Sequence, residues 1–325
     1  MSGGRVGPGA SALLGVAVGD ALGVPHEFRT RAQMEERPAT GMVGYGSHGQ
    51  PPGTWSDDTA LTLCLAEALV EGYDLARIAA GFVKWYRDGH WTARGTVFDI
   101  GLTTATAMHR LASMLEKGAA SELPLLRYTG EASENGDGSL MRILPLVFPL
   151  RGRSLAEQFP LVWEVSALTH RHIRAAMACQ IYLRLAEHLL DGKPKREAYR
   201  NTQHDIRQYW EAMKYAPTER QAFARIIAHN ITSLAIGDVR SGSYVVDSLE
   251  AAVWSFLREE TFADTVRSAV NLGGDTDTTA AIAGGLAGLY YGGEAIPENW
   301  LTPLARAEEI VALGDRLHAA PRHSL

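Results

Sequence analysis

Apolar residues recur at three- and four-residue intervals along almost the whole chain, and this period most constrains the fold. Good helix formers (Ala, Leu, Glu and Arg) dominate these stretches. Alternating β-branched runs are nearly absent, and the pair at 245–246 is the one strand-like patch. The spacing predicts helices over 9–23, 57–71, 74–87, 97–116, 155–168, 171–191, 196–215, 219–230, 247–257, 261–270, 276–290 and 302–318. The chain is therefore predicted to be all-α.

The composition is typical of a globular protein and excludes some partners. Its 325 residues are 46% hydrophobic and 21% charged, and no linker, repeat or charge block marks a boundary. We expect a single domain over 1–325, with its core at 9–318. The net charge of −6 argues against a nucleic-acid partner, because phosphate binding needs a basic face. Cys64 and Cys179 each lie in an apolar helical pattern and are expected to be buried thiols.

The apolar stretch at 10–19 has the look of a signal-peptide core, but Asp20 and a further helical pattern follow where a cleavage site should be. No uncharged apolar run approaches the roughly eighteen residues that a membrane span needs. We therefore expect a cytoplasmic protein that has no membrane partner and acts as a monomer.

Two acidic pairs stand at the beginnings of predicted helices, in Trp-Ser-Asp-Asp-Thr at 55–59 and Gly-Asp-Thr-Asp-Thr-Thr at 274–279. One acid at each start is explained by capping. Consecutive helical residues point about 100° apart, so Asp57 and Asp58 cannot both serve one cap. If the helix starts converge, four carboxylates and two hydroxyl groups need protons or cations to neutralise them. Such an oxygen set suits Mg²⁺, Mn²⁺ or Ca²⁺, as a pair of ions about 4 Å apart. The alternative is two independent, well-capped helices.

Three further acids are candidates for a site. Asp20, near the end of a predicted helix, could instead satisfy backbone groups of a neighbouring helix start. Glu27 lies in the long irregular segment 24–56, where it could act as acid, base or ligand support, or simply be solvated. Asp99 lies between bulky apolar residues, where a charged carboxylate would demand a cationic partner. Its alternative is a capping or salt-bridged aspartate.

A second irregular segment, 118–139, ends in the glycine-punctuated turn Glu-Asn-Gly-Asp-Gly-Ser at 134–139. Free N–H groups in such a turn could cradle a phosphate or ribose, although turns of this kind are common. His170 fits a capping or surface histidine equally well, and Tyr244 fits an ordinary core residue. The sequence contains no serine elbow, Cys–His pair, zinc-protease motif or dinucleotide-binding glycine fingerprint.

Taken in chain order, these motifs resemble those of the ADP-ribosylglycohydrolase family over nearly the whole sequence, and most of all its bacterial dinitrogenase reductase-activating branch. The matching stretches lie at 19–27, 55–59, 98–104, 135–142, 169–170, 242–249 and 273–278. The resemblance implies a compact multi-helix orthogonal bundle with two Mg²⁺ or Mn²⁺ ions. It also implies hydrolysis of the bond that joins ADP-ribose to an acceptor, on a protein or a small molecule.

The resemblance further implies roles for individual residues. The implied metal ligands are Ser56, Asp57, Asp58, Asp275, Asp277 and Thr278. Glu27 matches a flexible-loop glutamate near the metals, and Asp99 matches an aspartate that acts at an arginine–ribose bond, which favours ADP-ribosyl-arginine as the substrate. The implied cradle for the diphosphate and distal ribose comprises Asn135, Gly136, Ser139, Met141 and His170, with Tyr244 as the aromatic partner of adenine.

Two features depart from the family pattern. Asp137 stands where many relatives carry a small or neutral residue, and a carboxylate there would repel a diphosphate unless it is turned away. The segment 192–222, rich in charge and aromatic residues, matches no family motif, and we expect it to shape the acceptor side.

Three rival functions stay open. The first is hydrolysis of another ADP-ribose linkage: to serine, in O-acetyl-ADP-ribose, in a nucleic-acid adduct or in a small guanidine compound. The second is a non-catalytic ADP-ribose-binding regulatory module. The third is a metal-dependent phosphohydrolase, which the acidic residues alone would suggest.

Overall fold

The computed structural model describes residues 6–320, and within that range it contains helices and turns but no strand. The α-helices are α1 Pro8–Gly23, α2 Arg31–Glu36, α3 Asp57–Val70, α4 Leu75–Asp88, α5 Leu102–Glu116, α6 Val147–Leu150, α7 Leu155–Ala167, α8 Ile173–Leu190, α9 Lys195–Ala212, α10 Pro217–Ala222, α11 Ala224–Ile227, α12 Val245–Arg258, α13 Phe262–Val270, α14 Thr276–Tyr291, α15 Glu298–Leu301 and α16 Ala307–Ala319. The 3₁₀ helices are η1 Val24–His26, η2 Ala120–Tyr128, η3 Ala132–Glu134, η4 Leu144–Leu146, η5 Ile231–Ser233, η6 Ile236–Asp238 and η7 Gly293–Ala295. The predicted all-α fold is confirmed.

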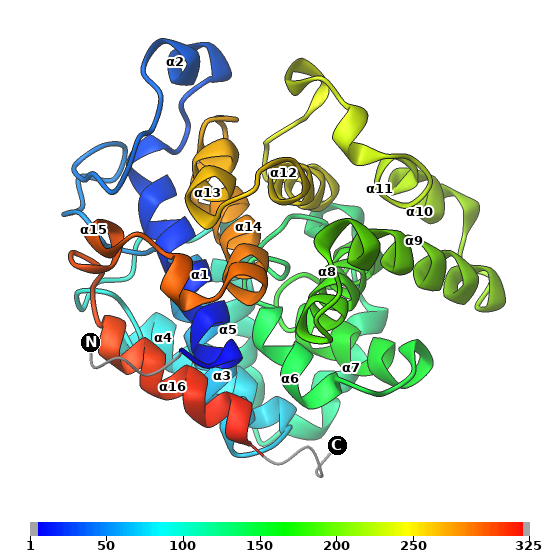
Figure 1. Cartoon of the computed structure of the whole chain (residues 1–325). Coiled ribbons are helices and arrows are strands. Elements are labelled where there is room, and N and C mark those ends of the chain that lie inside the picture. The colour runs from blue at the N-terminus through cyan, green and yellow to red at the C-terminus, as the bar shows by residue number, and fades with distance from the viewer. Residues whose placement is uncertain (1–5, 321–325) are drawn as a thin grey trace.

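Helices α1 and α14 lie side by side at the centre of the molecule (Figure 1). Their backbones touch because glycines face each other: a Cβ atom on Gly15 would lie 2.2 Å from the carbonyl oxygen of Gly284. A Cβ atom on Gly288 would lie 2.2 Å from the carbonyl oxygen of Ser11. Interiors packed this closely have no room for an added methyl group. Close helix packing therefore explains Gly284 and Gly288.

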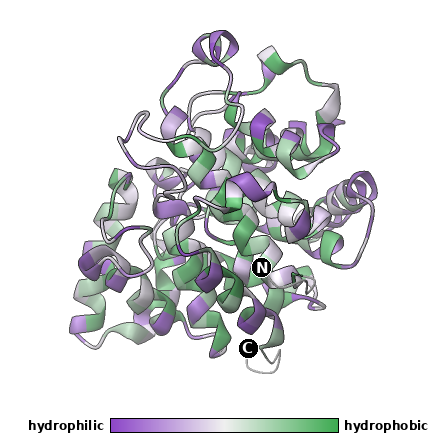
Figure 2. Ribbon diagram, turned by 60° about the vertical axis from the view of Figure 1, so that its left-hand side comes forward, coloured by the Kyte–Doolittle hydropathy of each residue, from purple (hydrophilic) through white to green (hydrophobic). Residues whose placement is uncertain are grey.

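The other helices cover this central pair in layers. Helices α3 and α16 pack against α1, while α12 and α13 pack against α14. Helix α8 lies against α12, and α9 lies outside α8, where α9, α10 and α11 form an outer arm (Figure 1). Hydrophobic and hydrophilic residues share the outer helices (Figure 2), as expected of helices with one buried face. The free thiols of Cys64 and Cys179 are buried, as predicted.

The stretch Pro8–His26 is long and apolar enough to pass for a membrane-spanning helix by length and composition. In the fold, 94% of its most apolar window is buried. Its packing against α14, α16 and α3 accounts for that apolar character, because a helix buried on all sides needs no polar face.

Several predicted helix boundaries are wrong. The helix predicted over 97–116 begins only at Leu102, because Asp99 has a left-handed backbone with φ of 57°. The helix predicted over 302–318 begins at Ala307, after the left-handed Arg306. The helix predicted over 219–230 is two short helices that meet at Phe223, and the strand-like pair 245–246 opens α12.

Candidate active site

The first turns of α3 and α14 meet, as predicted for the two acidic motifs. Thr278 Oγ1 of α14 donates a hydrogen bond to Asp58 Oδ2 of α3 at 3.4 Å. Ser56 Oγ donates to the same oxygen at 3.0 Å and also accepts from the Asp58 backbone N–H, so Ser56 is the N-cap of α3. Asp275 occupies the N-cap position of α14 but makes no capping bond with its side chain. The two helices are therefore not independent, and their acids share one volume.

Asp20, the buried acid of α1, ties that helix to the start of α3. Its Oδ1 accepts from the Ser56 backbone N–H at 2.9 Å, and its Oδ2 accepts from the backbone N–H and Oγ1 of Thr59 at 3.0 and 2.6 Å. Burial raises the pKa of Asp20 to about 6, although the hydrogen bonds from Thr59 and Ser56 oppose that shift. Asp20 thus accepts hydrogen bonds from the backbone at the start of α3, as in the structural alternative given above, and it lies beside Asp58 and Asp277.

The end of α1 also fixes Asp277 by direct backbone contact. A Cβ atom on Gly23 would lie 2.3 Å from the Cα of Asp277, so only glycine lets the chain approach this closely. One carboxylate oxygen each from Asp20, Asp58 and Asp277 lie within 4.8 Å of one another. The three acids come from α1, α3 and α14, so the packing of these helices determines the cluster.

The electrostatics of this cluster fit a bound cation. Burial raises the pKa of Asp58 and of Asp277 well above the usual value, and neighbouring carboxylates raise both further. Asp58 Oδ1 and Asp277 Oδ2 are buried and have no hydrogen-bond partner. Buried polar atoms are almost always partnered, so these two oxygens point to a missing positive charge. The residues present therefore fit a hard divalent cation that binds carboxylate oxygens.

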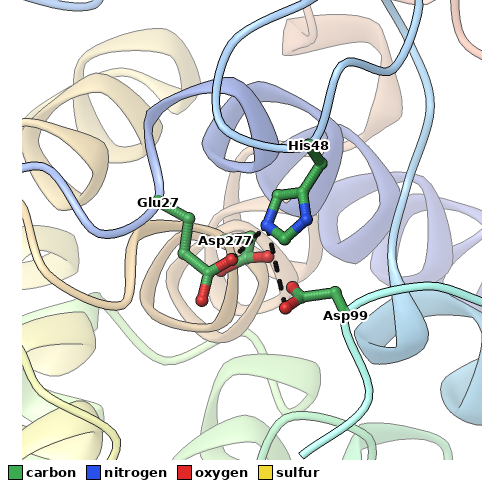
Figure 3. A group of neighbouring side chains, drawn as sticks. All are labelled: Glu27, His48, Asp99 and Asp277. Atoms are coloured by element: carbon green, nitrogen blue, oxygen red, sulfur yellow. Dashed lines mark hydrogen bonds and ion pairs between the residues drawn. The ribbon is translucent and has the colours of Figure 1, made fainter.

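A second group of side chains adjoins the first at Asp277 and includes a residue that the sequence did not indicate (Figure 3). Glu27, His48, Asp99 and Asp277 each place one possible ligand atom within 4.8 Å of the others. His48 Nε2 contacts the Glu27 carboxylate and lies 3.7 Å from Asp99 Oδ1. The all-oxygen set expected from the acidic motifs therefore has an imidazole beside it. Only the length of the irregular segment around His48 hinted at a function.

The two predicted catalytic acids are held by the backbone around them. Phe28 N–H donates to the Gly274 carbonyl at 2.8 Å, and Ser47 Oγ donates to the Glu27 carbonyl at 2.6 Å, so the segment carrying Glu27 is tied to the start of α14. Burial, together with the nearby Asp99 carboxylate, raises the pKa of Glu27 to about 9. Asp99 precedes α5, whose N-cap is Gly101, and therefore does not cap that helix. Its left-handed backbone is unusual for a residue other than glycine, and strained backbone of this kind is common at functional sites.

A cavity of about 420 Å³ joins the predicted catalytic, metal-binding and cradle residues. The predicted site residues that line it are Glu27, Asp57, Asp99, Gly136, Met141, His170, Asp275 and Thr278. Ser56, Asp58 and Asp277 are buried just behind these residues. The cavity does not include Asn135, Ser139 or Tyr244. The Ser139 hydroxyl is fully buried and accepts a hydrogen bond from Ser166 Oγ at 2.8 Å, so the structure does not bring this side chain to the cavity.

The wall carrying His170 is supported by a buried arginine that the sequence did not single out. The Arg142 guanidinium donates to the Gly138 carbonyl and to Thr169 Oγ1, which in turn contacts His170 Nδ1 at 2.9 Å. Burial, together with the positive charges of Arg142 and Arg110, lowers the pKa of His170 to about 3, so the imidazole is neutral. A Cβ atom on Gly138 would lie 2.5 Å from the His170 ring, which explains the glycine. His170 is thus neither capping nor on the surface.

Asp137 is turned away from solvent towards α12. Its carboxylate accepts a hydrogen bond from Ser248 Oγ at 2.5 Å. Burial raises the pKa of Asp137 well above its usual value, and the nearby Asp275 carboxylate raises it further. The acid that departs from the family pattern therefore adds to the acidic end of the cavity.

The segment 192–222 approaches the predicted site near Tyr244 and contributes no residue to the cavity wall. Glu219 of α10 holds Arg174 with two hydrogen bonds of 2.9 Å, and Arg174 donates to Tyr244 Oη at 3.0 Å. Tyr244 is the predicted adenine partner, so through Arg174 the segment contacts a residue assigned by prediction to the nucleotide side. Its expected role on the acceptor side stays a prediction.

Comparison with known proteins agrees with the motifs. The sequence model of the ADP-ribosylglycohydrolase family matches residues 9–324. The chain is 31% identical to ADP-ribosylarginine hydrolase Tri1 of Serratia proteamaculans, over 94% of this chain and 77% of that protein. It is 29% identical to ADP-ribosyl-[dinitrogen reductase] glycohydrolase of Rhodospirillum rubrum, over 90% and 88%. A solved structure described as an ADP-ribosylglycohydrolase-related protein complex superimposes with a TM-score of 0.75 at 31% identity, covering 96% of this chain and 97% of that one.

Proposed function

The chain belongs to the ADP-ribosylglycohydrolase family, and we propose that it hydrolyses the N-glycosidic bond between ADP-ribose and an arginine side chain. The observation that carries this proposal is the position of Asp99, a carboxylate that lines the same cavity as the buried acids. A carboxylate can hold a guanidinium group with two parallel hydrogen bonds. Two relatives whose names specify an ADP-ribosyl-arginine or a dinitrogen reductase substrate support the choice.

Asp58 and Asp277 carry the unpartnered oxygens that would hold a divalent cation, with Asp57, Asp275, Ser56 and Thr278 as the further predicted ligands. A cation bound there would orient the ribose hydroxyl groups and a water molecule, and would make that water easier to deprotonate. We propose two Mg²⁺ or Mn²⁺ ions, because six oxygen donors come from two helix starts.

Side chains of the protein would orient the substrate, transfer the proton and enclose the nucleotide. Asp99 would orient the guanidinium so that the scissile carbon–nitrogen bond faces the acidic end of the cavity. Water adds to the anomeric carbon as that bond breaks, and its proton passes by way of the Asp99 carboxylate to the departing guanidine nitrogen. Glu27 and His48 flank Asp99 and limit its freedom. Gly136, Met141 and His170 would enclose the nucleotide side of the substrate.

The direct experiment is release of ADP-ribose from an ADP-ribosyl-arginine substrate, with and without Mg²⁺ or Mn²⁺. Serine-linked ADP-ribose and O-acetyl-ADP-ribose are assayed beside it. Metal-dependent release that is fastest from the arginine adduct is the expected result. Faster turnover of another linkage would overturn the arginine assignment, and ADP-ribose binding without turnover of any substrate would indicate a regulatory module. Release of AMP instead of ADP-ribose would indicate a phosphohydrolase.

A further inference from the structure

Two exposed apolar side chains stand at the mouth of the candidate cavity. Among the described residues with large hydrophobic side chains, Leu102 and Phe28 are the most exposed, at 85% and 71%. Both line the cavity that contains Asp99. Single exposed apolar residues are common on proteins, but two that line the same cavity are candidates for contact with whatever binds there.

The surrounding structure holds the backbone of the exposed Phe28 in one conformation. Its backbone has a φ of 65°, a conformation that a bulky residue rarely adopts. The hydrogen bond from Phe28 N–H to the Gly274 carbonyl, and one from Arg29 N–H to the His26 carbonyl at 3.2 Å, keep that conformation in place. Strained backbone of this kind persists where the surrounding structure enforces it and is concentrated at functional sites.

Both side chains belong to the acceptor end of the cavity. The Phe28 ring lies 5.8 Å from the His48 ring, and His48 Nε2 lies 3.7 Å from Asp99 Oδ1. Leu102 is the first residue of α5 and follows Asp99 by three positions. A guanidinium held by Asp99 therefore connects to the rest of its acceptor past Phe28 and Leu102.

We propose that Phe28 and Leu102 form an acceptor-docking rim that contacts apolar side chains beside the modified arginine of a polypeptide acceptor. The inference rests on the proposed function and adds two residues that select the sequence around the modified arginine. Covering one such side chain on binding is worth about a tenfold change in apparent affinity.

The test compares kcat/KM for two substrates: small ADP-ribosyl-arginine, and a peptide with apolar residues flanking an ADP-ribosylated arginine. The variants are Phe28→Asn, since asparagine tolerates the left-handed backbone, and Leu102→Gln. Leu125→Gln is the matched control, because Leu125 is exposed but lies away from the cavity. The expected result is that the ratio of peptide to small-substrate kcat/KM falls about tenfold in each rim variant and is unchanged in the control.

A further peptide with glycines flanking the arginine should be insensitive to the rim substitutions. Equal losses on the small substrate and the apolar peptide would overturn the proposal, as would no loss on either. A concentration-dependent dimer that Phe28→Asn abolishes would assign the rim to a second copy of the chain and overturn it too. If the wild-type protein cleaves the small adduct but no peptide, the rim proposal fails and the proposed function stands. If it cleaves neither, the proposed function fails first.

Discussion

The inner and outer parts of the candidate cavity are built in different ways. The inner acids Asp20, Asp58 and Asp277 come from three helices that pack at the centre of the fold, and all three side chains are buried. The outer residues Asp99 and Phe28 come from irregular segments with left-handed backbones and reach solvent. The difference suggests that the helices maintain a fixed charge site, while the segments around it can vary with the acceptor.

The largest expected effect is on the inner part. Asp277→Ala removes the carboxylate that belongs to both acidic groups, so we expect kcat on ADP-ribosyl-arginine to fall at least about 100-fold. Stabilisation by Mg²⁺ in thermal unfolding should also be lost, because a cation that binds only the folded protein stabilises it. Asp88→Ala, at the exposed end of α4, serves as the control and should behave like the wild type. Unchanged turnover in Asp277→Ala would contradict the account.

The matching change in the outer part is Asp99→Asn, which keeps the size of the side chain and tolerates the left-handed backbone. We expect kcat to fall about 100-fold, because the amide cannot accept and pass on a proton. The thermal stabilisation by Mg²⁺ should remain, since Asp58 and Asp277 are intact. Loss of that stabilisation in Asp99→Asn would show that cation binding also depends on Asp99, so the inner and outer parts would not be separate sites.

A smaller effect tests whether helix packing fixes the inner acids. Gly23→Ala would force a Cβ atom against the Asp277 backbone at 2.3 Å, and we expect a loss of about 1–3 kcal/mol in the free energy of unfolding. Gly81→Ala in α4 is the matched control: its Cβ atom would meet nothing closer than 3.7 Å, so helix propensity should make it neutral or stabilising by up to about 1 kcal/mol. Denaturant titration measures both. Equal stability of the two variants would contradict close packing at Gly23.

The last effect is seen only in acid and concerns His170, in the cavity wall. Its pKa is lowered by burial to about 3 in the folded protein and is about 6.5 in an unfolded chain. Its contribution to stability is therefore complete above pH 6.5 and is lost as pH falls towards 3, by about 1.4 kcal/mol per pH unit. His170→Gln should reduce the steepness of acid destabilisation between these values, while His204→Gln on the exposed face of α9 should not. Equal slopes for His170→Gln and the wild type would contradict the burial of a neutral imidazole.

The same contrast explains what the sequence could predict. Helix periods and the doubled acids at 57–58 and 275–277 are local patterns, and local patterns can be recognised in a single chain. The two acidic pairs form one site as soon as the beginnings of α3 and α14 lie together. The structure bears out that expectation through the contact between Thr278 and Asp58.

Contacts between distant segments could not be predicted. His48 reaches Glu27 and Asp99 from an irregular segment with no period. Arg142 supports His170 only because two separate loops are folded together. Helix α5 begins late because the left-handed Asp99 interrupts a pattern that otherwise favours a helix. In each case tertiary packing decides the outcome: it either overrides the local helix propensity or brings together residues that are far apart in the sequence.

The most direct test of the central claim, that buried acids from helix starts hold the metal, is anomalous diffraction from crystals grown with Mn²⁺. The account predicts a manganese peak within coordination distance of Asp58 Oδ1 and Asp277 Oδ2, the two buried oxygens without partners. A peak that instead involves only Glu27, His48 and Asp99, or no peak near these acids at saturating Mn²⁺, would contradict it.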